Sequence, residues 1–123
     1  MLQEQELIAF VATRNAARAK AFYADTLGLH FVADEPVALV FDAHGTMLRI
    51  QKVDSHTAFP YTALGWRVAD ITAEVEALTA RGVRFERYDG FNQDAHGVWS
   101  APSGAKVAWF KDPDENVLSL TQF

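Results

Sequence analysis

The sequence predicts an α+β domain built from two tandem βαβββ modules. The 123 residues provide enough chain for one domain with its own core. The same order of strand and helix patterns occurs twice along the chain. In each half a helix pattern ends at a glycine that is followed by an apolar residue and, two positions later, a phenylalanine, at residues 27–31 and 81–85. These three observations predict a duplicated module rather than two unrelated domains.

Composition and charge exclude several classes of protein. Eleven basic and sixteen acidic residues leave a formal net charge of −5, which argues against a nucleic-acid binder. The absence of cysteine excludes disulfides, thiolate metal sites and cysteine nucleophiles. The apolar runs are of strand length and residues 1–6 do not resemble a signal peptide, so we expect no membrane partner and a cytoplasmic location.

The first module, about 6–53, is organised around one amphipathic helix. Asn15 is expected to cap a helix over 16–27, because its side chain can accept from the first free N–H groups. Gly28 supplies the left-handed residue that ends the helix, and Leu29 folds back as its apolar partner. The strands expected around this helix are 7–13, 29–33, 37–41 and 47–53, the last two forming a hairpin around 42–45.

The second module, about 61–123, repeats this order after a short polar linker at 54–60. Asp70 is expected to cap a helix whose apolar stripe is Ile71, Val75 and Leu78 and which ends at Gly82. The expected strands are 63–68, 83–87, 106–111 and 117–121, the last pair forming a hairpin around 112–116. The long segment 88–104 is either a functional loop or a mobile connector.

Three motifs in this order resemble the vicinal oxygen chelate superfamily, which includes glyoxalase I, extradiol dioxygenases and bleomycin resistance proteins. They are the AFYADTLGL helix end at 21–29, the WRVADI strand and helix start at 66–71, and the AWFKDPDENVL hairpin at 108–118. The resemblance implies a curved mixed sheet around a cup-shaped pocket between the modules. Glu115 departs from the family, which usually has glycine there, and must either adopt a positive φ or shift the turn.

The resemblance also implies where a metal ion would be bound. In metal-dependent members each module supplies one His or Gln from its first strand and one Glu from its last. Those positions fall on Ile8, Arg49, Ala63 and Ser119, none of which is a suitable ligand. Asp94 and His96 are the nearest other candidates, and we interpret them as solvated loop residues. The sequence therefore predicts no metal site and no cofactor.

The same register places apolar and aromatic side chains in the cup, with a few polar groups. Arg49 and Arg67 favour an anionic ligand, unless one of them pairs with an acid such as Glu35 or Asp94, or Arg49 only reaches the solvated rim. Trp99 is a lid over the cup, a core residue or a dimer contact. The candidate ligand-binding residues are Phe10, Leu39, Met47, Arg49, Gln51, Arg67, Trp99, Trp109 and Ser119.

Three classes of function follow from this pocket. We expect a homodimeric protein that binds a small anionic molecule without a metal ion and, like the bleomycin-resistance branch, sequesters its ligand rather than transforming it. The alternatives are a metal-dependent lyase, isomerase or dioxygenase with an atypical site, and a module that only mediates interactions. The sequence identifies no catalytic residue and leaves open whether any reaction is catalysed.

Overall fold

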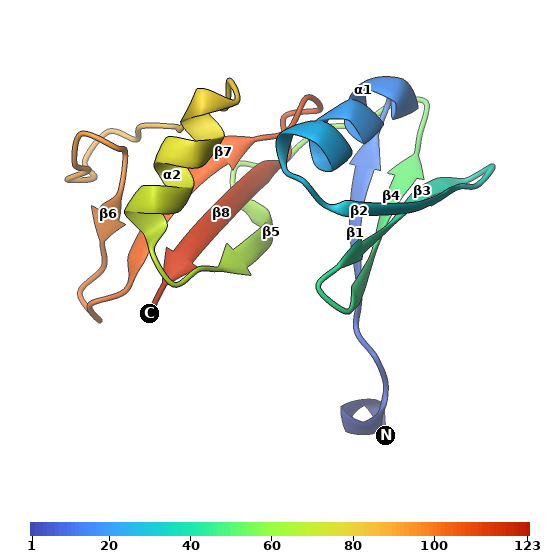
Figure 1. The fold of residues 1–123 in the computed structure, drawn as a ribbon, viewed down its shortest axis with the longest axis horizontal. Coiled ribbons are helices and arrows are strands. Elements are labelled where there is room, and N and C mark those ends of the chain that lie inside the picture. Colours follow the sequence, from blue (N-terminus) through green and yellow to red (C-terminus); the bar gives the residue numbers. More distant parts are fainter. The chain divides into compact units, whose positions relative to one another are not determined.

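The structure, a computed structural model of residues 1–123, consists of two compact units, Met1–Thr57 and Ala58–Phe123. Each unit contains one four-stranded mixed sheet, and the units correspond to the two predicted modules (Figure 1). The predicted α+β class with duplicated βαβββ modules is confirmed. No helix of the chain combines the length and the hydropathy that crossing a bilayer requires.

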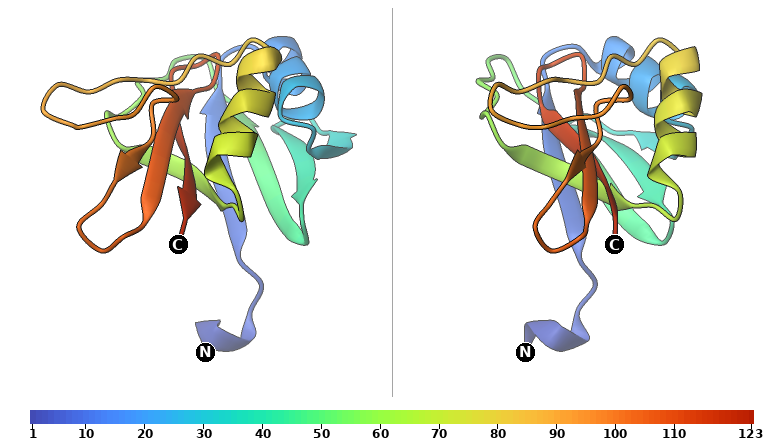
Figure 2. Two further views of the ribbon diagram at one scale, coloured as in Figure 1. Left: turned by 60° about the vertical axis from the view of Figure 1, so that its left-hand side comes forward. Right: turned by 90° about the vertical axis from the view of Figure 1, so that its left-hand side faces the viewer.

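In the N-terminal unit the strand order is β1-β4-β3-β2, with β1 parallel to β4 and the other neighbours antiparallel. A 3-10 turn, which the sequence did not predict, comes before β1 in the chain. In space it extends past the N-terminal end of that strand (Figures 1 and 2). The elements are η1 (Leu2–Glu4), β1 (Ile8–Thr13), α1 (Ala16–Lys20), η2 (Ala21–Thr26), β2 (His30–Asp34), β3 (Ala38–Ala43) and β4 (Thr46–Lys52).

The first helix begins as predicted but changes its winding. The Arg18 amide donates to the Asn15 side chain at 3.0 Å, which confirms the cap. After Lys20 the α-helix continues as a π-helical turn, η2, instead of remaining α-helical to residue 27. Gly28 has a φ of +75°, and the Leu29 amide donates back to the Tyr23 carbonyl at 2.9 Å, which closes the helix end.

The hairpin between β3 and β4 follows from local turn chemistry. His44 and Gly45 both have positive φ, at +51° and +90°, as a tight two-residue hairpin turn requires. The Gly45 amide donates to the Asp42 carboxylate at 2.9 Å. This turn brings Leu48 opposite Phe41 and Ile50 opposite Leu39, and these buried residues form the core beneath the helix.

In the C-terminal unit the strand order is β5-β8-β7-β6, again with one parallel pair, β5 and β8. Both views in Figure 2 show α2 on one side of β7 and β8. The Ala73 amide donates to the Asp70 carboxylate at 3.1 Å, so the predicted cap is confirmed. The elements are β5 (Thr62–Arg67), α2 (Ile71–Ala80), β6 (Trp99–Ser100), β7 (Lys106–Lys111) and β8 (Val117–Gln122).

The strand predicted over 83–87 is largely wrong. Only Phe85 forms a bridge, to Phe110 on β7, and the Glu86 amide donates to the Trp109 carbonyl at 2.7 Å. The Glu86 carbonyl accepts a hydrogen bond from the Gln93 side-chain amide, where in a regular strand it would accept one from the backbone of a neighbouring strand. The outer strand of this sheet is the short β6, inside the segment that was predicted as a loop.

The last hairpin turn contains Glu115 with a φ of +69°, the first of the two alternatives for this residue. The buried Asp112 carboxylate holds the turn: Oδ1 accepts the Asp114 and Asn116 amides, both at 2.9 Å, and Oδ2 accepts the Asn116 side chain at 2.8 Å. The Asp112 carboxylate thereby satisfies the buried Asp114 and Asn116 amides of the turn.

Candidate functional site

Each sheet has one face covered by its helix and one face without a helix. In the N-terminal sheet the residues directly opposite one another show that Phe10, Met47, Arg49 and Gln51 share the helix-free face. Phe10 lies opposite Arg49, and its side chain is half exposed. These four residues therefore share one face, and their role in binding a ligand stays a prediction.

Leu39 is the exception among the predicted residues of this sheet. It lies opposite Ile50, and both residues are fully buried on the helix-covered face. Because Leu39 is buried on the helix-covered face, the prediction that it lines a ligand pocket is wrong. Val40, its neighbour on β3, lies opposite Arg49 on the helix-free face instead.

Arg49 has an acidic partner. Its Nη2 lies 3.1 Å from Oε1 of Glu35, and the Arg49 side chain is 24% exposed. This is the alternative in which an acid neutralises the guanidinium, and Glu35 is that acid. Because the charge of Arg49 is already compensated, this arginine does not by itself favour an anionic ligand.

The helix-free face of the C-terminal sheet is centred on Ser119. Trp109 lies opposite Ser119 on one side, and Gly65 lies opposite it on the other. A Cβ atom on Gly65 would lie 2.8 Å from the Ser119 hydroxyl oxygen, so the serine occupies the space above the glycine. Arg67 and Thr121 form the next row of this face.

Arg67 differs from Arg49 in its surroundings. Its guanidinium carbon lies 5.2 Å from the centre of the Phe123 ring, and it makes no hydrogen bond or ion pair with the chain. It is exposed to solvent. Arg67 is therefore a cation on the helix-free face whose charge no carboxylate compensates.

Four aromatic side chains form a cluster centred on Trp109, the residue opposite Ser119, and we call them the aromatic cluster: Tyr88, Phe91, Trp99 and Trp109. The Phe91 ring stacks on Trp99 with centroids 5.0 Å apart and lies 5.6 Å from Trp109. Trp99 and Trp109 are 6.0 Å apart, and Tyr88 meets Trp109 edge to face at 5.5 Å. Trp99 is thus part of an aromatic surface on β6 and β7, on the same helix-free face.

A pocket of about 270 Å³ opens beside the aromatic cluster. Tyr88, Phe91 and Trp109 of the aromatic cluster line it, together with Tyr61, the residue before β5. Aromatic walls with a few polar groups at the edge are typical of small-molecule sites. The remaining lining residues are Pro60, Thr62 and Val117.

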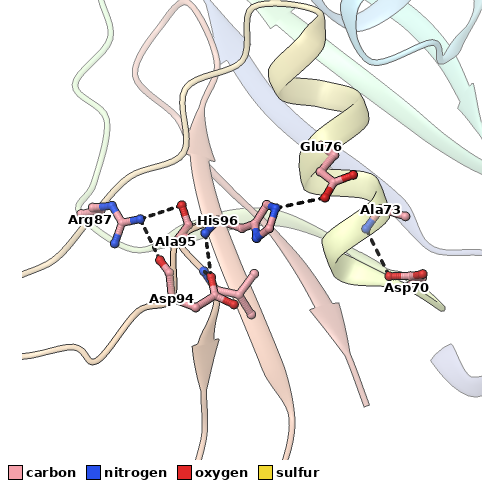
Figure 3. Close-up of polar contacts among 8 residues, drawn as sticks. Asp70, Ala73, Glu76, Arg87, Asp94, Ala95 and His96 are labelled. Carbon is pink, nitrogen blue, oxygen red and sulfur yellow. Dashed lines mark hydrogen bonds and ion pairs between the residues drawn. The ribbon is translucent and has the colours of Figure 1, made fainter.

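The segment that carries Phe91 is held in place by side-chain hydrogen bonds. Gln93 accepts the Tyr88 amide at 2.8 Å and donates to the carbonyls of Glu86 and Gly97 at 2.9 and 2.7 Å. Figure 3 shows Arg87 donating to the Asp94 and Ala95 carbonyls. These contacts are typical of an ordered loop that positions Phe91, not of a loose connector.

Two groups near the cluster have shifted pKa values. Partial burial is the main cause that raises the pKa of the Tyr88 phenol, and the negative charge of Glu86 adds to it. The hydrogen bond to Glu115, 3.2 Å away, raises the pKa of Lys111, and Glu86 contributes as well. Tyr88 therefore stays neutral and Lys111 stays charged over a wider pH range than they would in a peptide.

The residues present do not fit a metal centre of the kind the resemblance implies. Ile8, Arg49, Ala63 and Ser119 offer no imidazole or carboxylate, and no group of three or more His, Asp or Glu comes together in the chain. The Asp94 carboxylate accepts the amides of His96 and Val98 at 2.9 Å, and the His96 ring contacts Glu76. Neither Asp94 nor His96 is arranged as one of a set of ligands.

Sequence reasoning missed Tyr61, Tyr88 and Phe91. All three lie outside the predicted strands, where no periodicity assigns a side chain to a face. For Tyr88 and Phe91 the only signal in the sequence was their place in a segment with several aromatic residues, 85–99, and Tyr61 lies outside that segment.

The fold and these two helix-free faces define a protein of tandem βαβββ modules with an aromatic pocket on its second sheet. Residues 7–120 match the Glyoxalase/Bleomycin resistance protein/Dioxygenase superfamily, and the chain belongs to this superfamily. The resemblance drawn from the three sequence motifs is confirmed. No curated protein matches the sequence.

Solved structures of the same superfamily share the fold. A glyoxalase family protein from Enterococcus faecalis is 21% identical with a TM-score of 0.75, covering 98% of this chain and 99% of the other. A superfamily member from Sphaerobacter thermophilus is 24% identical with a TM-score of 0.72, covering 95% and 97%. A lactoylglutathione lyase from Agrobacterium tumefaciens is 18% identical with a TM-score of 0.63, covering 96% and 93%.

Proposed function

We propose that this protein binds a small organic molecule, without a metal ion, on the helix-free face of the C-terminal sheet. The observation that carries the proposal is the chemical composition of that sheet. None of its four strands contains His, Asp or Glu, whereas two of its tryptophans belong to the aromatic cluster. Such a surface offers dispersion and stacking but no ligands for a divalent cation.

The proposed ligand has a flat apolar part and an anionic group. Rings such as those of Trp109 and Phe91 gain from offset stacking against a planar molecule. Arg67 lies on the same face as Trp109, one row away from Ser119, and no carboxylate compensates its charge. A carboxylate, sulfonate or phosphate on the ligand would meet this guanidinium with charge-assisted hydrogen bonds. Arg49 does not take part in this selection because Glu35 neutralises it.

Naphthalene-1-sulfonate is a suitable probe because it combines a flat ring system with one anionic group. We expect saturable binding in calorimetry, unchanged by excess EDTA. Trp109→Leu should weaken binding roughly tenfold or more, since stacking and burial at one aromatic anchor contribute about 1.5 kcal/mol. Arg67→Gln should weaken binding of the sulfonate but not of the neutral analogue naphthalene-1-methanol.

Two results would contradict the proposal. Binding of the probe that requires a divalent cation, or unchanged binding after Trp109→Leu, would remove it. A stoichiometric divalent metal in the purified protein, together with turnover of a vicinal-oxygen substrate, would instead favour the metal-dependent enzyme of the same superfamily. Lys106→Gln, which also removes one positive charge but lies outside the helix-free face and the aromatic pocket, serves as the charge-matched control for Arg67→Gln.

A homodimer is a second part of the proposal. Ile8, Phe10 and Met47 leave 43%, 50% and 42% of their surface exposed on the helix-free face of the N-terminal sheet. Neighbouring exposed apolar side chains favour association, and two-fold dimers are the commonest oligomers. Sedimentation equilibrium of the parent protein and of Phe10→Glu tests this, with a monomer at high concentration contradicting it. The cytoplasmic location stays a prediction from the sequence.

A further inference from the structure

A second pocket of the C-terminal unit lies along α2, on the side opposite to the aromatic pocket. It measures about 530 Å³, within the range of small-molecule sites. Its apolar wall is formed by Val75 on α2 together with Val83 and Phe85 on the segment that follows. Phe85 packs edge to face on Phe110, with centroids 5.3 Å apart, and Phe110 belongs to the helix-covered face of the sheet. This pocket, which we call the α2 pocket, is therefore separate from the helix-free face.

Two arginines line the α2 pocket without a carboxylate partner. Arg84 is exposed and makes no hydrogen bond or ion pair with the chain. Arg87 uses Nη2 to donate to the carbonyls of Asp94 and Ala95 at 2.7 and 3.0 Å, and these partners are uncharged (Figure 3). Both positive charges therefore remain uncompensated in a chain whose net charge is −5.

The acidic groups near the α2 pocket have partners other than the two arginines. Glu76 is the one carboxylate that lines it, and its Oε1 lies 3.1 Å from Nε2 of His96, which lines the pocket as well (Figure 3). The Asp94 carboxylate accepts the amides of His96 and Val98 within its own loop. The lining residues thus leave a surplus of positive charge beside an apolar wall.

We propose that the α2 pocket binds a small monocarboxylate with a short apolar chain. The carboxylate would meet the guanidinium groups of Arg84 and Arg87, whose planar arrays of donors match two oxygen atoms. The apolar chain would cover Val75, Val83 and Phe85, which removes apolar surface of both partners from water. An organic cation fits neither arginine, and an uncharged molecule leaves both charges without a partner.

Hexanoate is the probe, titrated at pH 7 into 15N-labelled protein. We expect saturable chemical-shift changes at the backbone amides of 75–79, 83–87 and 95–97. Hexylammonium, which has the same chain and the opposite charge, should produce none. Arg84→Gln should weaken hexanoate binding roughly tenfold, the effect of losing one charge-assisted hydrogen bond.

Lys106→Gln is the matched control, because it also removes one positive charge from the C-terminal unit but lies outside both pockets. It should leave the hexanoate affinity within about twofold, since screened charges at a distance contribute little. Equal weakening by both variants would mean that hexanoate responds only to net charge and would overturn the proposal. Shift changes confined to 88–91 and 109 would place hexanoate at the aromatic cluster and would overturn it as well.

Discussion

Arg49 and Glu35 form an ion pair across the N-terminal sheet, with Nη2 and Oε1 3.1 Å apart, between residues separated by fourteen positions in the chain. The pair lies on the helix-free face, where Phe10 and Val40 flank the arginine. Because Glu35 neutralises the guanidinium, Arg49 presents no uncompensated positive charge to a ligand on this face. The first prediction concerns this pair.

Glu35→Gln should create an anion site that the parent protein lacks. The variant leaves the positive charge of a partly buried arginine without a partner, so benzoate should bind it more tightly than it binds the parent in calorimetry. The stability cost should stay below about 1 kcal/mol, since the Glu35 carboxylate is half exposed. The double variant Glu35→Gln/Arg49→Gln is the control, and equal benzoate affinity in all three proteins would contradict the prediction.

Gly65→Ala should destabilise the C-terminal unit through one contact. The new methyl group would lie 2.8 Å from the Ser119 hydroxyl oxygen and would force the serine side chain to move. Turning the serine hydroxyl away from its preferred rotamer costs about 0.5–1.5 kcal/mol, measured by urea unfolding. Because Ser119→Ala removes the clashing oxygen, the double variant should recover most of the loss. Additive effects of the two substitutions would show that the contact is not the cause.

Glu115→Gly should stabilise the last hairpin. Glu115 holds a φ of +69°, a conformation that glycine adopts without steric cost, and relief of this strain is worth about 1 kcal/mol. Glu115→Ala is the matched control because it keeps the strain while it removes the 3.2 Å contact with Lys111. The midpoint of thermal unfolding should rise for glycine and not for alanine, and a fall with glycine would contradict the prediction.

Gln93→Ala should release the segment that carries Phe91. The substitution removes three side-chain hydrogen bonds to backbone groups of residues 86, 88 and 97, at a cost of about 1–3 kcal/mol. Since Phe91 stacks on Trp99, tryptophan fluorescence should change as the segment loosens. Asn92→Ala, an exposed amide beside Gln93, should change neither property. Unchanged fluorescence in Gln93→Ala would argue that other contacts position Phe91.

The Tyr88 phenol should titrate above its ordinary pKa of 10.0. The difference in tyrosinate absorbance between the parent protein and Tyr88→Phe measures this pKa, and Glu86→Gln should lower it by removing a nearby negative charge. Because the pKa of Tyr88 is higher in the folded state than in the unfolded state, the neutral phenol favours the folded state. This contribution to the free energy of unfolding is complete below pH 10. That contribution is lost as the pH rises through the folded-state pKa. A pKa below 10 for Tyr88 would contradict the arrangement around the aromatic cluster.

Several features of this protein were determined by local sequence. The caps at Asn15 and Asp70 and the positive φ of Gly28 follow from residues within one helical turn of each helix end. The register implied by the family resemblance, combined with the two-residue period of the strands, placed Arg49 on the face without a helix and Ser119 opposite Trp109. The caps and the glycine needed no information from distant parts of the chain.

Other features were decided only by tertiary structure. Leu39 lies in a run of four buried residues, 38–41, where the absence of alternation leaves the face of each side chain undefined. The strand expected at 83–87 is replaced by side-chain hydrogen bonds from Gln93, which a strand pattern does not reveal. Glu35 reaches Arg49, and Phe91 reaches Trp109, only after the chain has folded back. Such long-range pairings depend on packing, because no local preference of the chain selects them.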